Sequence, residues 1–215
     1  MKKEQVARWW FTATVIMAVV GLTIQVLVTA NDDRSFFETP ASRAFNTLFF
    51  FTIQSNAIVA VTSGLLAIRP ARNSTIFWVF RLIGVIGIFV TGFVYNTMLA
   101  GLYELTPWGS VANSILHLIV PVLAVLGWIL FGPRSNATWT CGALVLLYPI
   151  AWLVVTLIRG PIIDWYPYPF LNVITQGYAR VALNALLIAL LFIALTAGAV
   201  AFDRWSTRRG KQVTF

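Results

Sequence analysis

The sequence predicts an all-α integral membrane protein, a bundle of six transmembrane helices with the N- and C-termini in the cytoplasm. Hydrophobic residues make up 59% of the 215-residue chain and charged residues only 10%, whereas a soluble domain has about 25% charged residues. Six long stretches contain no Asp, Glu, Lys or Arg. The Lys and Arg residues are distributed unevenly between the segments that connect these stretches.

A transmembrane helix needs about 20 apolar residues to cross the hydrocarbon core of a bilayer. Each charge-free stretch reaches this length, and together they leave too little chain for a separate soluble domain. Because backbone polar groups must be satisfied internally in hydrocarbon, we expect the stretches to be helices packed as one domain over residues 1–215. The charge-free stretches are 9–30, 44–68, 82–102, 111–132, 137–158 and 181–202. The predicted helices are 9–30, 44–68, 76–102, 110–132, 137–158 and 173–202.

The first stretch has two features of a signal peptide: a basic segment precedes it, and Val28-Thr29-Ala30 is similar to a signal-peptidase site. The apolar core of a signal peptide is about 7–15 residues long, which is shorter than 9–30. We therefore interpret 9–30 as the first helix. Short connections rich in Pro and Gly separate later helices and predict antiparallel neighbours. These connections include Arg69-Pro70, Gly132-Pro133 and Gly160-Pro161.

Positive charge indicates the orientation of the helices, since Lys and Arg are enriched in cytoplasmic loops. With the N-terminus inside, eleven basic residues lie on the inner side and four on the outer side. The formal net charge of +8 is then a membrane-orientation signal, and nucleic acid is not expected as a partner. The inner residues are Lys2, Lys3, Arg8, Arg69, Arg72, Arg81, Arg134, Arg204, Arg208, Arg209 and Lys211, and the outer ones are Arg34, Arg43, Arg159 and Arg180.

The composition restricts the possible chemistry. Cys141 is the single cysteine and His117 the single histidine, which excludes an internal disulfide, zinc fingers, Fe–S clusters and bis-histidine haem ligation. The sequence also has no G-x-S-x-G elbow, H-E-x-x-H, P-loop or Rossmann fingerprint. We expect no metal and no cofactor.

Polar residues gather in the outer half of the predicted bundle, at depths judged from 1.5 Å per helical residue. Polar groups inside membrane spans are costly, so they are candidate functional residues. Each also has a structural interpretation: a Thr hydroxyl commonly bonds a carbonyl of its own helix, and a His or Asn can join neighbouring helices. The candidates are Thr47, Asn96, Asn113, His117, Arg159, Arg180 and Asn184.

A hydroxyl and an imidazole are the components that acyl transfer requires, together with donors for the developing oxyanion. Thr47 with His117 can supply the nucleophile and the base. Asn113, at i−4 from His117, can orient the imidazole, and Asp164 is the other candidate for that role. Further candidates are Asn96 or Asn184 as donors facing the substrate, Arg159 or Arg180 as partners of a substrate carboxylate, and Thr52, Ser55, Thr91 and Ser114 as rival hydroxyls.

Five short motifs resemble one family of membrane proteins. They are FNTLFFFTIQ (45–54), TGFVYN (91–96), NSILH (113–117), WYPYPF (165–170) and YPFL (168–171). The chain is similar to the androgen-induced and androgen-dependent TFPI-regulating protein family of six-helix membrane hydrolases, and more similar still to its bacterial branch. The resemblance covers the second to the sixth predicted helix. It implies a bacterial protein of the cytoplasmic membrane.

The resemblance implies an activity and two catalytic residues. Animal members are threonine hydrolases that cleave fatty acid esters of hydroxy fatty acids with one Thr and one His. Motif matching assigns the nucleophile to Thr47, seven residues before Gln54, and the base to His117, four residues after Asn113. The chain has Ser114 where animal members have a second histidine, so the natural ester need not be the same.

Two other hypotheses follow from the same residues. The protein can be a non-catalytic binder or carrier of lipids or small amphiphiles, with the polar layer as its binding site. It can also be a scaffold whose polar residues only pack helices. For the hydrolase and for the binder or carrier, the expected partners are a lipid substrate or ligand and the lipids of the bilayer.

Overall fold

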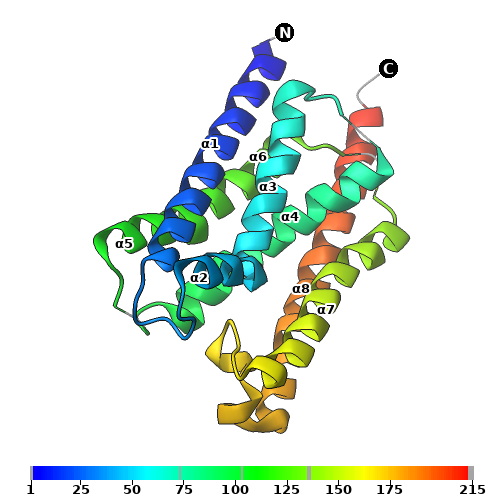
Figure 1. Cartoon of the computed structure of the whole chain (residues 1–215). Coiled ribbons are helices and arrows are strands. Elements are labelled where there is room, and N and C mark those ends of the chain that lie inside the picture. The colour runs from blue at the N-terminus through cyan, green and yellow to red at the C-terminus, as the bar shows by residue number, and fades with distance from the viewer. Residues whose placement is uncertain (1, 73, 103, 135–136, 213–215) are drawn as a thin grey trace.

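The computed structural model, which describes residues 2–72, 74–102, 104–134 and 137–212, is all-helical (Figure 1). Within these residues six helical segments are long and apolar enough to cross a membrane, which indicates a multi-pass membrane protein and confirms the six predicted spans. The segments are Lys2–Ala30, Phe51–Ile68, Thr75–Leu99, Pro107–Phe131, Trp139–Ile163 and Val173–Arg208.

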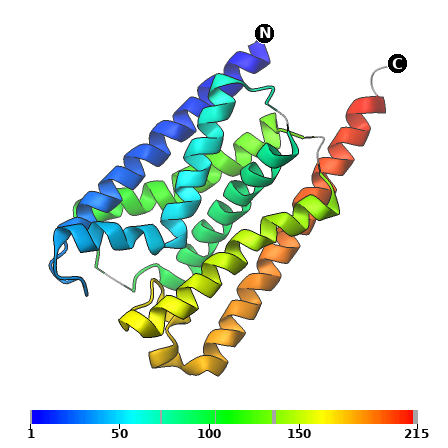
Figure 2. The ribbon, with the colours of Figure 1, turned by 45° about the vertical axis from the view of Figure 1, so that its right-hand side comes forward.

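The six spans form two groups. Helices α1, α3 and α6 contact one another, and α4 contacts α3 and α6, while α7 and α8 pair with each other and both contact α4. The N- and C-terminal ends of the chain lie at the same end of the bundle in both ribbon views (Figures 1 and 2). We call this the terminal end and the other the opposite end. The bounds are α1 Lys2–Ala30, α3 Phe51–Ile68, α4 Thr75–Val94, α5 Pro107–Ser114, α6 Val120–Phe131, α7 Trp139–Ile163 and α8 Val173–Gln212.

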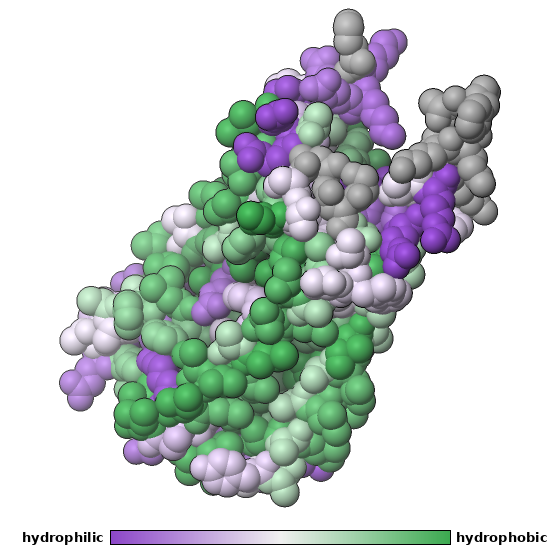
Figure 3. Space-filling view, turned by 90° about the vertical axis from the view of Figure 1, so that its right-hand side faces the viewer, coloured by the Kyte–Doolittle hydropathy of each residue, from purple (hydrophilic) through white to green (hydrophobic). Residues whose placement is uncertain are grey.

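Burial identifies α4 as the central helix. In the most apolar part of the third span 72% of residues are buried, compared with 22% for the fifth and 17% for the sixth. Helices α7 and α8 instead expose large aliphatic side chains, such as Leu147 and Leu187. Figure 3 shows hydrophobic residues over most of the face on the α7–α8 side, with hydrophilic residues gathered mainly toward the terminal end. This surface suits contact with lipid rather than water.

Hydroxyl side chains begin several helices. Thr39, Ser74, Thr106 and Thr138 have extended backbone and accept a hydrogen bond from the N–H group three residues later. Such N-caps satisfy one of the donors that a helix leaves unpaired at its start. The starts of α2 (Pro40–Asn46), α4, α5 and α7 therefore have a local cause in the sequence.

The predicted helix 44–68 is divided in the structure. Helix α2 continues into a 3₁₀ turn, η1 (Thr47–Phe49), Phe50 is extended, and α3 starts at Phe51. In both ribbon views α2 runs across the end of α3 (Figures 1 and 2). No Pro or Gly marks the break, so hydropathy and helix-breaking residues do not reveal it.

Side chains satisfy the backbone groups exposed by this break. Gln54 Nε2 donates to the Leu48 carbonyl at 2.8 Å, and Trp152 Nε1 donates to the Phe49 carbonyl at 3.0 Å. Because Trp152 is on α7, the packing of α7 against α3 stabilises the interruption.

Other boundaries also differ from the predicted ranges. Helix α7 continues past residue 158 to Ile163, so Arg159 is helical rather than part of a loop. Helix α8 has non-helical backbone at Gly177, where φ is 73°. A positive φ is accessible to glycine at little cost, and the chain bends there before the long part of α8.

Arg81 was expected among the basic residues of the inner side, but the structure buries it within the bundle. Its side chain is 1% exposed, and its Nη1 donates to Ser63 Oγ at 3.1 Å and to Thr62 Oγ1 at 3.3 Å. Its guanidinium also lies 5.3 Å from the centre of the Phe11 ring. Arg81 therefore joins α4 to α1 and α3.

Candidate functional site

Two π-helical segments face each other near the opposite end of the bundle. They are η2 (Tyr95–Leu99), which continues α4, and η3 (Ile115–Ile119), which joins α5 to α6. Such widened turns are rare and occur frequently at functional sites. Here they surround the single histidine.

Pro121 explains part of the irregular backbone at η3. Proline has no N–H group, so the carbonyl of His117, four residues earlier, lacks its usual helical donor. Asn96 supplies a replacement: its Nδ2 lies 3.3 Å from the His117 carbonyl oxygen and 2.7 Å from that of Gly92. The amide therefore connects η2 to η3 at the level of the histidine.

Gly92 allows this close contact between the two segments. A Cβ at this position would lie 2.8 Å from the His117 carbonyl oxygen and 3.2 Å from Cγ of Pro121. The first distance is too short for any real Cβ atom. Hence only glycine fits at residue 92 without moving His117.

Hydrogen bonding sets the tautomer of His117. Its Nδ1 lies 3.2 Å from the backbone carbonyl of Asn113. Because a carbonyl only accepts hydrogen bonds, Nδ1 carries the proton and Nε2 is left as an acceptor. The Tyr95 ring stacks on the imidazole with 4.0 Å between ring centres, which fixes the plane of the ring.

The hydroxyl that faces Nε2 belongs to Thr52. Its Oγ1 lies 3.4 Å from His117 Nε2 and 3.2 Å from the hydroxyl oxygen of Tyr168. Thr52 is in the first turn of α3 and 8% exposed. The three side chains come from three different parts of the chain, and they form a hydroxyl–imidazole–phenol cluster.

Tyr168 has a second role as a cap of α3. The backbone N–H of Thr52, one of the donors without a helical partner at the start of α3, donates to the Tyr168 hydroxyl at 3.2 Å. The phenol in turn has its own proton available for Thr52 Oγ1 or a ligand. Burial raises the pKa of Tyr168, so the phenol is neutral at physiological pH.

An apolar cavity of about 160 Å³ lies beside this cluster, between α4, α7 and α8. Thr52, Tyr95 and Tyr168 contribute to its wall and supply its polar side, and Thr91 contributes a fourth hydroxyl. Its apolar wall includes Val94, Leu146, Pro149, Leu153, Ile188 and Phe192. The cavity therefore suits an apolar chain whose polar group lies near Thr52.

Thr47 does not contact His117 among the described residues. Its hydroxyl donates to the Ala44 carbonyl at 2.7 Å, and the residue is 2% exposed within η1. The structure thus brings His117 together with Thr52, one of the rival hydroxyls. Among the other rivals, Ser114 bonds the Ser110 carbonyl of its own helix, and Ser55 and Thr91 are buried.

The remaining expected site residues are dispersed. Asn96 and the backbone of Asn113 support His117, as described above. Asn184 donates to the Phe170 carbonyl at 2.9 Å, Arg180 is exposed on α8, and Arg159 donates to Asn46 Oδ1 at 2.7 Å. Asp164, at the end of α7, is exposed, and within the described chain the imidazole nitrogens contact Asn113 and Thr52 instead.

Tyr95 and Tyr168 were not identified as site residues from the sequence. Two features of the sequence pointed to this region. Pro121, four residues after His117, indicates irregular backbone beside the histidine, and a run of aromatic and proline residues contains Tyr168. As for metal ions, the described residues contain no group of three His, Cys, Asp or Glu side chains able to hold one.

Comparisons with protein-family models, with curated proteins and with solved structures find no match for this chain. The cluster itself is therefore the basis of the functional argument.

Proposed function

We propose that this protein is an intramembrane hydrolase of lipid esters, in which a threonine hydroxyl attacks the ester and His117 is the general base. The observation that carries the proposal is the 3.4 Å contact between Thr52 Oγ1 and the acceptor nitrogen of His117. General bases act within hydrogen-bonding reach of the proton that they remove. The apolar cavity beside Thr52 supports a substrate with a long hydrocarbon chain.

In the proposed reaction Thr52 Oγ1 forms a bond to the ester carbonyl carbon, while Nε2 of His117 takes the hydroxyl proton. Collapse of the tetrahedral intermediate breaks the ester C–O bond, and His117 returns the proton to the leaving alkoxide. Water, deprotonated by His117, then attacks the acyl-threonine; the bond between the acyl carbon and Thr52 Oγ1 breaks, a fatty acid is released, and His117 returns the proton to Oγ1.

Two features beside Thr52 favour negative charge on its Oγ1. Thr52 lies in the first turn of the helix, where the backbone N–H groups and the helix dipole stabilise an anion. The Tyr168 hydroxyl adds a neutral donor beside the same oxygen. The base is oriented by Asn113 and Tyr95.

Thr47 remains the nucleophile that the family resemblance implies. The contacts favour Thr52 instead, because the Thr47 hydroxyl is engaged by Ala44. Parallel substitution of both residues separates the two assignments. The fatty acid esters of hydroxy fatty acids suggested by the resemblance belong among the substrates tested.

The experiment measures hydrolysis of long-chain fatty esters by the purified protein and its variants Thr52→Val, Thr47→Val and His117→Gln. Loss of a base or nucleophile is expected to lower the rate by a factor of about 10²–10⁴ in Thr52→Val and His117→Gln, with both proteins still folded at the assay temperature. Ser114→Ala is a matched control, since Ser114 bonds only its own helix. If Thr47→Val is inactive and Thr52→Val active, the nucleophile is Thr47.

Full activity in His117→Gln would overturn the assignment of His117 as the general base. If instead the wild-type protein hydrolyses no ester, the apolar cavity favours the second candidate function, a binder or carrier of lipids or small amphiphiles. That function predicts stable binding of a fatty ester without turnover.

We also infer that the terminal end faces the cytoplasm of a bacterial plasma membrane. The distribution of Lys and Arg supports this orientation. The site near Thr52 then lies in the outer half of the bilayer.

A further inference from the structure

A second hollow shares Trp152 with the apolar cavity. It has a volume of about 300 Å³, and it lies between α2, η1, the start of α3 and α7. We call it the α2–α7 groove. The side chain of Trp152 lines both hollows and is held by its hydrogen bond to the Phe49 carbonyl. The lining of the groove includes Phe45, Leu48, Phe49, Trp152, Val155 and Thr156, and Gln54 and Tyr148 add polar groups to it.

The groove is open to lipid along an apolar side. Phe45 and Leu48 are 62% and 53% exposed, although both lie in a chain segment expected at the outer level of the membrane. A hydrocarbon chain in the groove would cover these side chains. The buried hydroxyl of Thr156 is one of the few polar groups in the wall.

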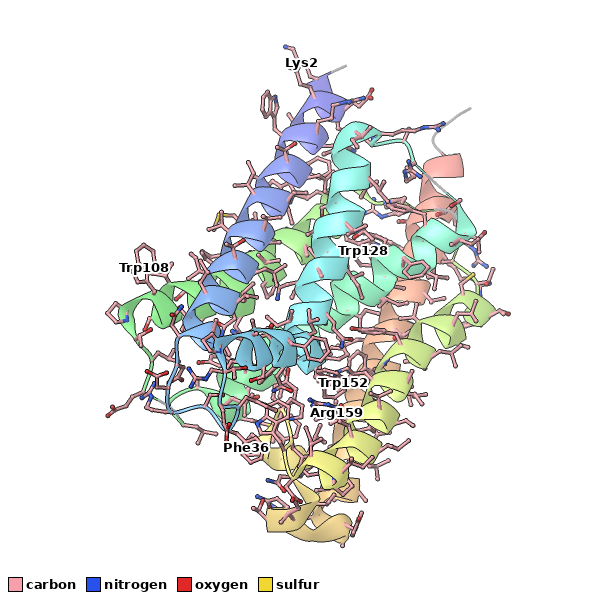
Figure 4. The ribbon with its side chains drawn as sticks, viewed as in Figure 1. Lys2, Phe36, Trp108, Trp128, Trp152 and Arg159 are labelled. Carbon is pink, nitrogen blue, oxygen red and sulfur yellow. The ribbon has the colours of Figure 1, made fainter. Side chains whose placement is uncertain are left out.

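Arg159 lies at the end of this groove. It follows the lining residues Val155 and Thr156 by one helical turn, so it is on the same face of α7. Its guanidinium lies 3.7 Å from the centre of the Phe49 ring, and Nη2 donates to Asn46 Oδ1. Figure 4 shows Arg159 and Trp152 on the same stretch of α7, beside α2 and η1.

The environment of Arg159 differs from those of Arg34 and Arg43. Arg34 is paired with Asp32, and Arg43 with Asp33. Within the described ranges Arg159 has no carboxylate partner: its contacts are an amide oxygen and the aromatic rings of Phe49 and Trp165. These contacts hold the guanidinium in place without neutralising it, and leave other N–H donors for a ligand.

We propose that the α2–α7 groove binds a single-chain amphiphile with an anionic head group. The carboxylate or phosphate head lies against Arg159, and the hydrocarbon chain lies over Phe45, Leu48 and Val155. Arg is the side chain best suited to such anions, because its planar donors match their oxygen atoms. The site does not depend on turnover at Thr52, so it goes beyond the proposed hydrolase.

The test measures binding of three ligands to the full-length protein in nanodiscs: palmitate, hexadecyl phosphate and hexadecanol. Arg159→Gln is expected to weaken binding of at least one anionic ligand by about tenfold or more, because a charge-assisted hydrogen bond is lost. Hexadecanol binding should not change. Arg180→Gln is the matched control, since it removes the same charge from an exposed position away from the groove.

A second variant tests the position of the chain. The larger side chain in Val155→Trp fills the groove, so this variant should bind all three ligands more weakly. If Arg159→Gln weakens the binding of palmitate alone, the groove is a fatty acid site. If it weakens the binding of hexadecyl phosphate alone, the groove is a lipid phosphate site. Both results support the proposal. Unchanged anion binding in folded Arg159→Gln, or unchanged binding of every ligand in folded Val155→Trp, would overturn it.

Binding is measured with protein that carries His117→Gln, so that hydrolysis through His117 does not contribute to the result. If the protein hydrolyses no ester but the His117→Gln variant still binds palmitate through Arg159, only the proposed function fails. If hydrolysis of a neutral ester persists while Arg159→Gln binds both palmitate and hexadecyl phosphate normally, only the groove proposal fails.

Discussion

The side-chain amide of Asn96 donates to the backbone carbonyl of His117, the acceptor that Pro121 leaves without a helical donor. This contact joins two π-helical segments and holds the backbone of the only histidine. Asn96 was expected to face a substrate. The structure uses its amide to position the proposed base instead.

Replacing Asn96 by Ala should therefore destabilise the protein by about 1–2 kcal/mol, because two carbonyl groups lose a donor. For a chain of this size, about 1 kcal/mol corresponds to a shift of roughly 2–4 °C in melting temperature, which thermal unfolding in detergent can measure. Thr97→Val is the control, since Thr97 bonds only carbonyls of its own helix. Equal stability of Asn96→Ala and wild type would show that the contact is not formed.

Gly92→Ala should be more damaging. The added methyl group would lie 2.8 Å from the His117 carbonyl oxygen, so α4 and η3 must move apart. Overpacking of this kind costs about 1–3 kcal/mol, and it should also displace His117 and lower any esterase activity.

Gly198→Ala provides the comparison for Gly92→Ala, because a Cβ at Gly198 meets no atom within 4 Å. Thermal unfolding of both variants checks the prediction. A Gly92→Ala protein as stable as Gly198→Ala would contradict the close approach of the two segments.

Tyr168→Phe should remove a contribution to the free energy of unfolding that depends on pH. Burial raises the pKa of Tyr168 above its ordinary value of 10.0, so the folded protein retains the phenol proton while the unfolded chain loses it. This contribution is complete below about pH 10 and is lost as the pH rises through the folded pKa.

Melting temperatures of wild type and Tyr168→Phe between pH 8 and pH 11 check this behaviour. Wild type should be the more stable protein at pH 8, because Tyr168 bonds Thr52, and its advantage should shrink above about pH 10. An advantage that grows with pH would indicate that the phenolate is the favoured form.

Orientation can be tested with single cysteines in a Cys141→Ser protein. We expect a membrane-impermeant maleimide to label Glu104→Cys from outside intact cells and Arg69→Cys only after lysis. Both positions are in connections between spans, at opposite ends of the bundle. The reverse pattern would show that the termini face outward.

Much of the architecture could be predicted from the sequence because it depends on local composition. Each membrane span must supply its own backbone hydrogen bonds and an apolar surface, so hydropathy alone located all six. Polar residues such as His117 and Asn96 were recognisable as candidates, since groups of this kind are rare in such helices.

The sequence by itself determined the six spans, their alternating direction and the single imidazole available for acid–base chemistry. Only the tertiary structure decided that the helix predicted from residue 44 is interrupted before Phe51, and that Thr52 rather than Thr47 faces His117. The physical reason is that the interruption leaves backbone groups unpaired. Their partners include Trp152 and Tyr168, more than a hundred residues away in the chain, where no local pattern reveals them.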